Sequence, residues 1–260
     1  MKRLFLMLLL LPLTGVYEAA AWGAKGHDVV AYIAECNLTP KARKALARVL
    51  GGHSLVYDAS YPDFVRSNPA YNGTSTWHYA NVDEGYTYAS MPKNPDGDVL
   101  TASEFLAGEL RNKELDDSLR KAYTVMLIHF IGDMHCPMHA GHKSDLGGNR
   151  WPVKWFGEPA NLHGVWDSKL IESYRHWSYS EWREQLDRHT KREKAAIAGD
   201  GTMLDWLLET VELSKAIYAA TPVDYNFSFD DTIKYTTEMI EPQLLKAGYR
   251  LAKLLNEIYG

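Results

Sequence analysis

Histidine and aspartate residues recur in this chain at a spacing that suits metal ligation. His129 and Asp133 are four residues apart, and His163 and Asp167 repeat the same interval. On a helix, residues at this spacing project from one face, one turn apart. Imidazole nitrogen and carboxylate oxygen are common ligands of Zn²⁺. The two pairs together predict a metal site.

One such pair would not be enough, because a lone histidine on a helix is more often a hydrogen-bonded structural residue than a ligand. Four of the ten histidines, however, fall between His129 and His142. Pro137 should end or bend the helix in this segment, so that His139 points in a different direction. The segment could therefore supply ligands to two different metal ions. We expect no ligand role for His135 or His142.

Further segments carry the same residue types in local patterns of their own. They are Trp22-Gly-Ala-Lys-Gly-His27, Ala59-Ser-Tyr-Pro-Asp63-Phe-Val-Arg66, Trp77-His78-Tyr-Ala-Asn81 and Gly147-Gly-Asn149. With the two His/Asp motifs, this pattern resembles the S1/P1 family of zinc-dependent nucleases and, more distantly, the bacterial zinc phospholipases C that share its fold. The match covers a whole ligand set in the right order, so it is far more specific than one short motif.

The resemblance implies a mainly α, single-domain helical fold of the phospholipase C/P1 nuclease type, with long loops around a trinuclear zinc site. It implies three Zn²⁺ per chain. The first would be held by Asp63, His78, His129 and Asp133, the second by His139, His163 and Asp167, and the third by His27, Asp133 and the amino nitrogen and carbonyl oxygen of Trp22. Asp133 would thus bridge two metal ions.

The resemblance also implies a reaction and three catalytic residues, Arg66, Asp63 and Asp133. Zinc lowers the pKa of bound water to about 7, so a hydroxide is available at neutral pH to attack phosphorus in line. The departing 3′ oxygen would be stabilised by zinc, which leaves a 5′-phosphate. Arg66 would stabilise the phosphoryl charge in the transition state; the alternative is an ordinary surface charge.

For substrate binding, the resemblance points to Tyr79, Asn81 and Asn149. Tyr79 occupies the place of a family aromatic residue on which a base stacks, although it could instead be core packing. Asn81 stands where better-known members have an aspartate, which puts the base preference in doubt because an amide both donates and accepts hydrogen bonds. The expected substrates are single-stranded DNA and RNA, and 3′-nucleotides, since an unstacked base is easier to reach.

Two rival functions stay open. A zinc phospholipase C would use a similar metal set on a lipid phosphodiester but should expose apolar loops; Tyr86, Tyr88 and Met91 on one loop keep this alternative in view. A metal-stabilised binding protein is the other, although structural zinc sites are usually closed and rich in cysteine. We expect no stable membrane association and a monomer.

The N-terminal residues predict export. Lys2 and Arg3 precede an apolar run, Leu4–Leu13, and small residues end at Ala21. This is typical of a cleavable signal peptide over residues 1–21, whereas a membrane anchor needs about 20 apolar residues. Cleavage between Ala21 and Trp22 would leave a single domain over 22–260, secreted or periplasmic. It would also free an α-amine with a pKa near ~8, which a cation can deprotonate.

The net charge and the number of cysteines limit how this protein could bind nucleic acid and whether disulfides could stabilise it. The chain has 28 Lys and Arg against 33 Asp and Glu, a net charge of −5, whereas proteins that hold nucleic acid mainly through phosphate neutralisation are usually basic. Any affinity for phosphate must therefore come from a local source such as bound metal. Cys36 and Cys136 could form one bridge or remain two buried thiols.

Apolar side chains recur at helical spacing along much of the chain. We therefore expect helices to position the candidate ligands. Thr39 should cap a helix that begins at Pro40, and Pro242 should kink the last helix. The expected helices are a pair over Gly26–Leu50, then Thr101–Asn112, Asp116–Met138, Met203–Ala220 and Phe229–Tyr259. Ser54–Asp98 and His142–Ala160 are rich in Gly, Pro, Asn and aromatic residues and should be long surface loops.

Overall fold

The helix with the most ligand candidates, α5 (Asp117–Met134), is buried over its C-terminal half. Asp116 caps its N-terminus by accepting hydrogen bonds from the backbone N–H groups of Ser118 and Leu119. The helix ends four residues before the expected Met138, and Pro137 opens a short 3₁₀ turn, η2 (Pro137–Ala140). Since proline lacks an N–H and its ring clashes with the preceding turn, the break lies upstream of it.

A computed structural model describes residues 22–260, so the expected signal over 1–21 lies outside the described residues.

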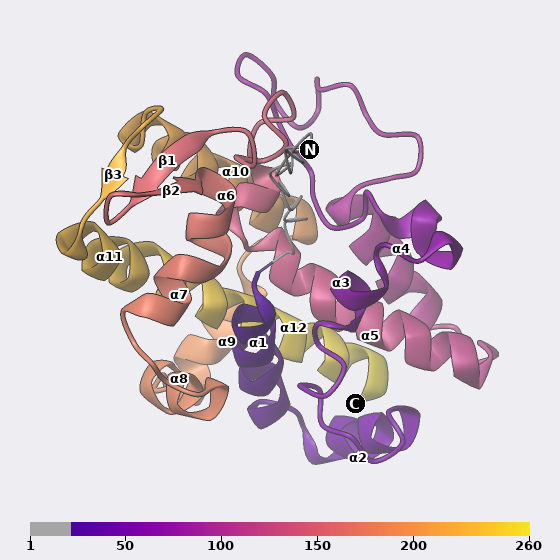
Figure 1. Cartoon of the computed structure of the whole chain (residues 1–260). Coiled ribbons are helices and arrows are strands. Elements are labelled where there is room, and N and C mark those ends of the chain that lie inside the picture. The colour runs from indigo at the N-terminus through magenta and orange to yellow at the C-terminus, as the bar shows by residue number, and fades with distance from the viewer. Residues whose placement is uncertain (1–21) are drawn as a thin grey trace, which may run out of the picture.

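Two long helices at opposite ends of the sequence pack against each other, α1 (Ala24–Cys36) and α12 (Glu241–Tyr259). Gly248 permits their close approach, because a Cβ at this position would lie 2.4 Å from Ile33 Cγ2. Figure 1 shows these two helices, indigo and yellow, side by side in the lower part of the molecule.

Capping residues explain where two of the helices begin. The hydroxyl of Thr39 accepts a hydrogen bond from Ala42 N, and α2 (Pro40–Val49) begins at Pro40, which confirms both expectations. Asp98 forms a capping box with Thr101, so α4 (Val99–Leu110) starts two residues before the expected position. The chain has further helices between these elements. They are α3 (Tyr61–Val65), η1 (Pro69–Thr74), α6 (Leu162–Gly164), α7 (Leu170–Ser173), α8 (Tyr179–Leu186), α9 (Lys191–Gly199) and α10 (Met203–Ala220).

The last expected helix is interrupted just before Pro242. It consists of α11 (Phe229–Tyr235), a π-helical turn η4 (Thr236–Ile240) and then α12. Pro242 cannot donate to a carbonyl one turn earlier, and a wider turn accommodates its ring. A similar π-helical turn, η3 (Val165–Lys169), follows α6 and carries Asp167.

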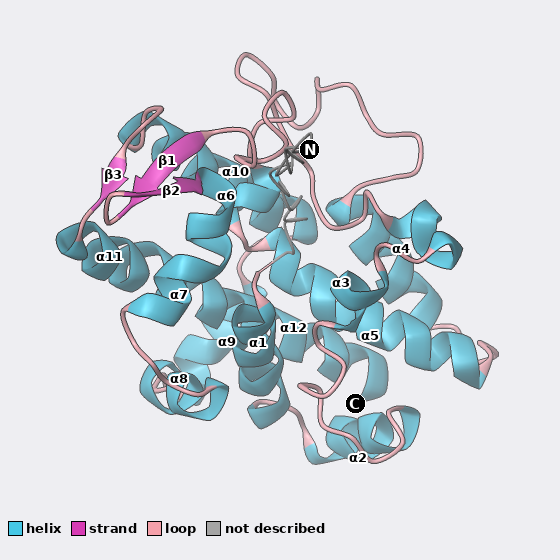
Figure 2. Cartoon of the chain, in the orientation of Figure 1, coloured by secondary structure: helices cyan, strands magenta, loops and turns pink. Residues whose placement is uncertain are grey.

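The two segments expected to be long surface loops also contain short helices and strands. Ser54–Asp98 contains α3 and η1, and His142–Ala160 leads into a hairpin of β1 (Pro152–Trp155) and β2 (Glu158–Asn161). The short strand β3 (Asn226–Phe227) pairs parallel to β1, which gives the order β2-β1-β3. Figure 2 shows this small sheet at one edge of a mainly helical molecule, so the expected single-domain helical fold is confirmed.

Two further expectations concern bridges and membranes. Cys36 and Cys136 are free thiols, Cys36 half-buried and Cys136 buried. Across residues 22–260, each helix is too short or too polar to cross a bilayer.

A candidate metal centre at the end of helix α5

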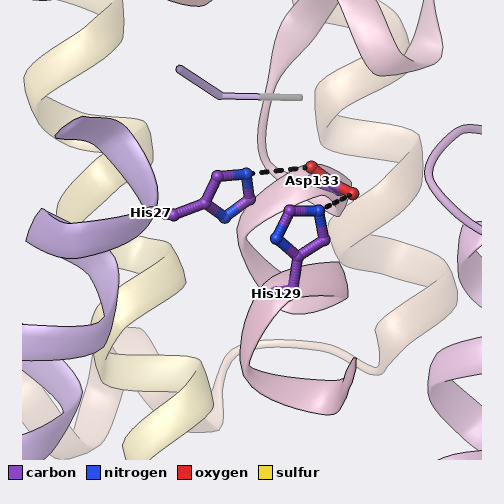
Figure 3. Close-up of side chains that lie close together, drawn as sticks. All are labelled: His27, His129 and Asp133. Atoms are coloured by element: carbon purple, nitrogen blue, oxygen red, sulfur yellow. Dashed lines mark ion pairs between the residues drawn. The ribbon is translucent and has the colours of Figure 1, made fainter. Parts of the chain in front are cut away.

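The carboxylate of Asp133, on the last turn of α5, contacts imidazoles from several segments of the chain, and three of them lie within 3.4 Å of its oxygens. Its Oδ2 lies 3.1 Å from His78 Nδ1 and 3.2 Å from His129 Nε2, and its Oδ1 lies 3.4 Å from His27 Nε2. Figure 3 shows His27 from α1 and His129 from α5 directed at the two oxygens. All four side chains are buried. The predicted His-x-x-x-Asp pair on α5 therefore does share one face of the helix.

Asp63, on α3, belongs to the same group. Its Oδ1 lies 3.4 Å from His78 Nδ1 and 3.5 Å from His129 Nε2. The backbone carbonyl of Ala59 accepts a hydrogen bond of 2.8 Å from His129 Nδ1. This bond orients the ring so that Nε2 faces the carboxylates, as is usual for metal-binding histidines.

A glycine leaves room for the first histidine. The rings of His27 and His129 stack with centroids 3.9 Å apart. A Cβ on Gly132 would lie 2.9 Å from His27 Nδ1, which is closer than real Cβ contacts allow. The absence of a side chain at Gly132 therefore lets α1 bring His27 against α5, and sequence reasoning had not singled out this residue.

A second buried group lies beyond Pro137. His139 Nδ1 donates to the carbonyl of His78 at 2.5 Å, and His163 Nδ1 donates to that of Gly147 at 2.7 Å. The two rings lie 5.2 Å apart. Asp167 is buried close to His139. The structure thus brings together the three residues predicted for a second ion.

The groups of ligand atoms that lie close together in the structure differ in part from the three zinc ligand sets that the family resemblance implied. Ligand atoms within 4.8 Å of one another come from three sets: His27, His129 and Asp133; Asp63, His78 and His129; and Cys136, His139 and Asp167. Sequence reasoning missed Cys136 as a member. Its position three residues before His139, across the break at Pro137, was the only available signal.

Trp22 lies beside the same cluster. Its side chain is fully buried, and the next residue, Gly23, donates its N–H to the carbonyl of Asp167 at 2.9 Å. A Cβ on Gly26 would lie 2.9 Å from Trp22 Cβ. The start of the described chain is thus held against Asp167 of the second ligand group.

Crowding of buried carboxylates and imidazoles shifts their pKa values strongly. Burial raises the pKa of Asp167 well above its usual value, and the nearby carboxylates of Asp63 and Asp133 add to this. Burial also lowers the pKa of His27 to about 4. Burial opposes ionisation of Asp63 too, but the His129 imidazole outweighs it and holds the pKa of that carboxyl at about 2.

Several of these polar atoms are buried without a hydrogen-bond partner in the described part of the chain. They include Oδ1 of Asp63, Asp133 and Asp167, both ring nitrogens of His27, and Nε2 of His139. Buried polar atoms are nearly always satisfied, and an ion is one way to satisfy them. Nitrogen and oxygen donors of this kind suit zinc, so the residues present fit a metal centre.

A cleft of 710 Å³ adjoins the cluster. Its lining includes His139 and His163 together with the four residues expected to contact substrate, Arg66, Tyr79, Asn81 and Asn149. Asn149 Nδ2 donates to the carbonyl of Leu146 at 2.8 Å, whereas Asn81 Oδ1 is buried without a hydrogen-bond partner. Two of the ligand candidates, His139 and His163, thus lie in the same cleft as the substrate candidates.

Comparison with known proteins identifies the same family as the ligand pattern. The family model S1/P1 Nuclease matches residues 22–260. Endonuclease 1 of Arabidopsis thaliana is 30% identical over 99% of this chain and 93% of its own. Nuclease P1 of Penicillium citrinum is 28% identical over 92% and 98%, and Nuclease S1 of Aspergillus oryzae is 25% identical over 96% and 97%. The chain belongs to the S1/P1 nuclease family, whose members are in general zinc enzymes.

Proposed function

We propose that this protein is a zinc-dependent phosphodiesterase that hydrolyses single-stranded DNA and RNA to 5′-phosphomononucleotides, with 3′-nucleotidase activity. Its family makes it a nuclease; the substrate and product are the proposal. The observation that carries it is a cluster of buried His and Asp atoms that lack hydrogen-bond partners among the described residues, next to a 710 Å³ cleft whose lining includes His139 and His163.

Nine residues would bind three zinc ions. The first ion would be held by Asp63, His78, His129 and Asp133, the second by His139, His163 and Asp167, and the third by His27, Asp133 and the terminal amine and carbonyl of Trp22. When bound, zinc supplies a Lewis acid that polarises the phosphoryl group and makes a water molecule acidic enough to react at neutral pH.

The side chains of the cleft would orient the substrate. Arg66 lines the cleft, and its positive charge partly offsets the raised pKa that burial gives Asp167. Its guanidinium would stabilise negative charge on phosphorus. Tyr79 is half-buried in the cleft wall, which supports base stacking over a role in the core alone. Asn81 Oδ1 would accept a hydrogen bond from the base edge.

The proposal also covers the export of the protein and its oligomeric state. Cleavage between Ala21 and Trp22 would release a secreted or periplasmic monomer without stable membrane association. Trp22 would then carry a free amine at the place where its side chain is already buried beside His27.

The test is zinc-dependent hydrolysis of a single-stranded oligonucleotide by protein that begins at Trp22, with a short-chain phosphatidylcholine assayed in parallel. We expect 5′-mononucleotides, lost with a chelator and with His129→Ala. His176→Ala, at an exposed histidine, is the matched control and should keep full activity. Lipid cleavage without oligonucleotide cleavage would instead assign the protein to the phospholipase branch.

A further inference from the structure

Three aromatic side chains gather on the surface beside the candidate metal centre. Phe64 has 82% of its surface exposed and Tyr61 has 42%. The ring of Tyr61 lies 6.5 Å from that of Phe64 and 6.4 Å from that of Tyr71. Single exposed aromatic residues are common, but a contiguous group marks an interaction site. We call Tyr61, Phe64 and Tyr71 the aromatic platform.

A second cavity opens next to this platform. It measures 300 Å³ and is lined by Tyr61 and Tyr71, with Val125 and Phe130 as apolar lining. Lys121 from α5 and Asp58 add a cation and a carboxylate to the same lining. An apolar interior with a few polar groups is typical of a small-ligand site. A nucleobase, which has a flat π face and a polar edge, matches this combination.

Helix α3 connects the platform to the candidate metal centre. This helix carries Tyr61 on the second cavity and Asp63 in the ligand cluster, and Arg66, just after it, lines the larger cleft. Five helical residues rise only about 7 Å. A strand whose phosphate lies at the cluster would therefore have bases within reach of both cavities.

We propose that the aromatic platform and its cavity bind the second base of a single-stranded substrate, on the far side of the reacting phosphate from the base in the larger cleft. The inference rests on the proposed function and deepens it. Stacking on aromatic side chains is tolerant of sequence, and Lys121 attracts the polyanionic strand. The platform would thus favour dinucleotides and longer strands over substrates with one base.

The experiment compares three substrates for the zinc-loaded protein that begins at Trp22. They are a dithymidine phosphodiester and two analogues in which one or the other nucleoside lacks its base. Phe64→Ala should lower kcat/KM about tenfold on the intact dinucleotide. It should have no effect on the analogue that lacks the base bound by the platform. Phe64→Trp should retain wild-type activity because it keeps the stacking surface.

Phe229→Ala is the matched control, because Phe229 is 76% exposed and lies on α11, away from α3. It should leave all three rates unchanged. Equal losses on all three substrates with Phe64→Ala, or no loss at all, would overturn the inference. So would a dimer that Phe64→Ala converts to monomer in light scattering, since the platform would then bind a second copy. Wild-type protein that cleaves none of the three substrates would overturn the proposed function itself.

Discussion

The two oxygens of Asp133 are shared among imidazoles that arrive from α1, from α5 and from the segment after η1. A carboxylate in this position cannot be replaced by an amide of the same shape without losing charge and one acceptor oxygen. The spacing of His129 and Asp133 was enough to predict that these two residues act together. Their grouping with His27 and His78 was predicted only through the family resemblance, because no spacing rule joins segments this far apart.

Gly132 offers a test of this packing in which no proposed ligand residue is itself substituted. Gly132→Ala should push His27 away, since its Cβ would lie 2.9 Å from the ring. We expect the loss of zinc from the site that includes His27, measured by metal analysis of the purified protein. Gly108→Ala is the control, because nothing lies within 4 Å of its Cβ. It should keep all zinc and gain about 0.5–1 kcal/mol of stability. Full zinc content in both variants would contradict the packing.

Trp22 allows a second test at this scale. Extending the chain by one residue before Trp22 converts the terminal amine into a peptide nitrogen, which no longer serves as a ligand. We expect two zinc ions in place of three, measured by native mass spectrometry, and most activity to be lost. One residue added after Gly260, which is exposed, is the control. Three zinc ions in the extended protein would remove Trp22 from the ligand set.

At the scale of elements, one aspartate links four helices. Asp187, at the C-terminus of α8, has a fully buried side chain. It accepts hydrogen bonds from Tyr249 on α12 at 2.7 Å and from Asn37 at the end of α1 at 3.0 Å. Lys194 on α9 and Arg183 on α8 form ion pairs with it. This carboxylate therefore holds α1, α8, α9 and α12 together.

Asp187→Asn should lower the free energy of unfolding by about 1–3 kcal/mol at neutral pH. Burial would raise the pKa of Asp187, but hydrogen bonds from Lys194 and Tyr249 outweigh it and hold that pKa below its usual value. A lowered pKa contributes stability above the unfolded pKa of about 3.9, and this is lost as pH falls through the folded pKa. The difference between wild type and variant should thus shrink below about pH 4, measured by urea unfolding.

The exposed Asp200, which ends α9, provides the control for this measurement. Asp200→Asn should unfold at the same urea concentration as wild type at every pH. An Asp187→Asn variant as stable as wild type at pH 7 would show that the four helices do not depend on this link.

Sequence patterns predicted the long amphipathic helices well and the short elements poorly. α10 has the predicted bounds, Met203–Ala220, because its apolar positions recur over many turns. The hairpin of β1 and β2 was predicted as loop, since its strands have four residues each and one of them pairs with β3, far along the chain. Strands this short carry too few residues for alternation to be visible. No expectation covered α8 and α9, each with a single buried residue.

At the scale of the whole molecule, the candidate metal centre joins segments that are otherwise far apart in sequence. Its residues come from α1, α3, α5, η2, α6 and η3 and from the segment after η1. In Figure 1 the ribbon colours of these elements run from indigo through magenta to salmon. The other helices and the small sheet complete the fold around these segments. Ion binding and folding should therefore be coupled.

Removal of zinc should lower the melting temperature as well as stop hydrolysis. The ion binds a site that only the folded chain assembles, and a ligand at 100 times its Kd stabilises by about 2.7 kcal/mol. For a chain of this size, that corresponds to roughly 5–10 °C. The carboxylates of Asp63, Asp133 and Asp167 also repel one another when no cation lies between them. Differential scanning calorimetry before and after chelation measures the shift. Zinc should restore the original value, whereas Mg²⁺ should not, because it prefers all-oxygen octahedral ligands. An unchanged melting temperature in metal-free protein would mean that the cluster does not hold the fold together through a bound ion.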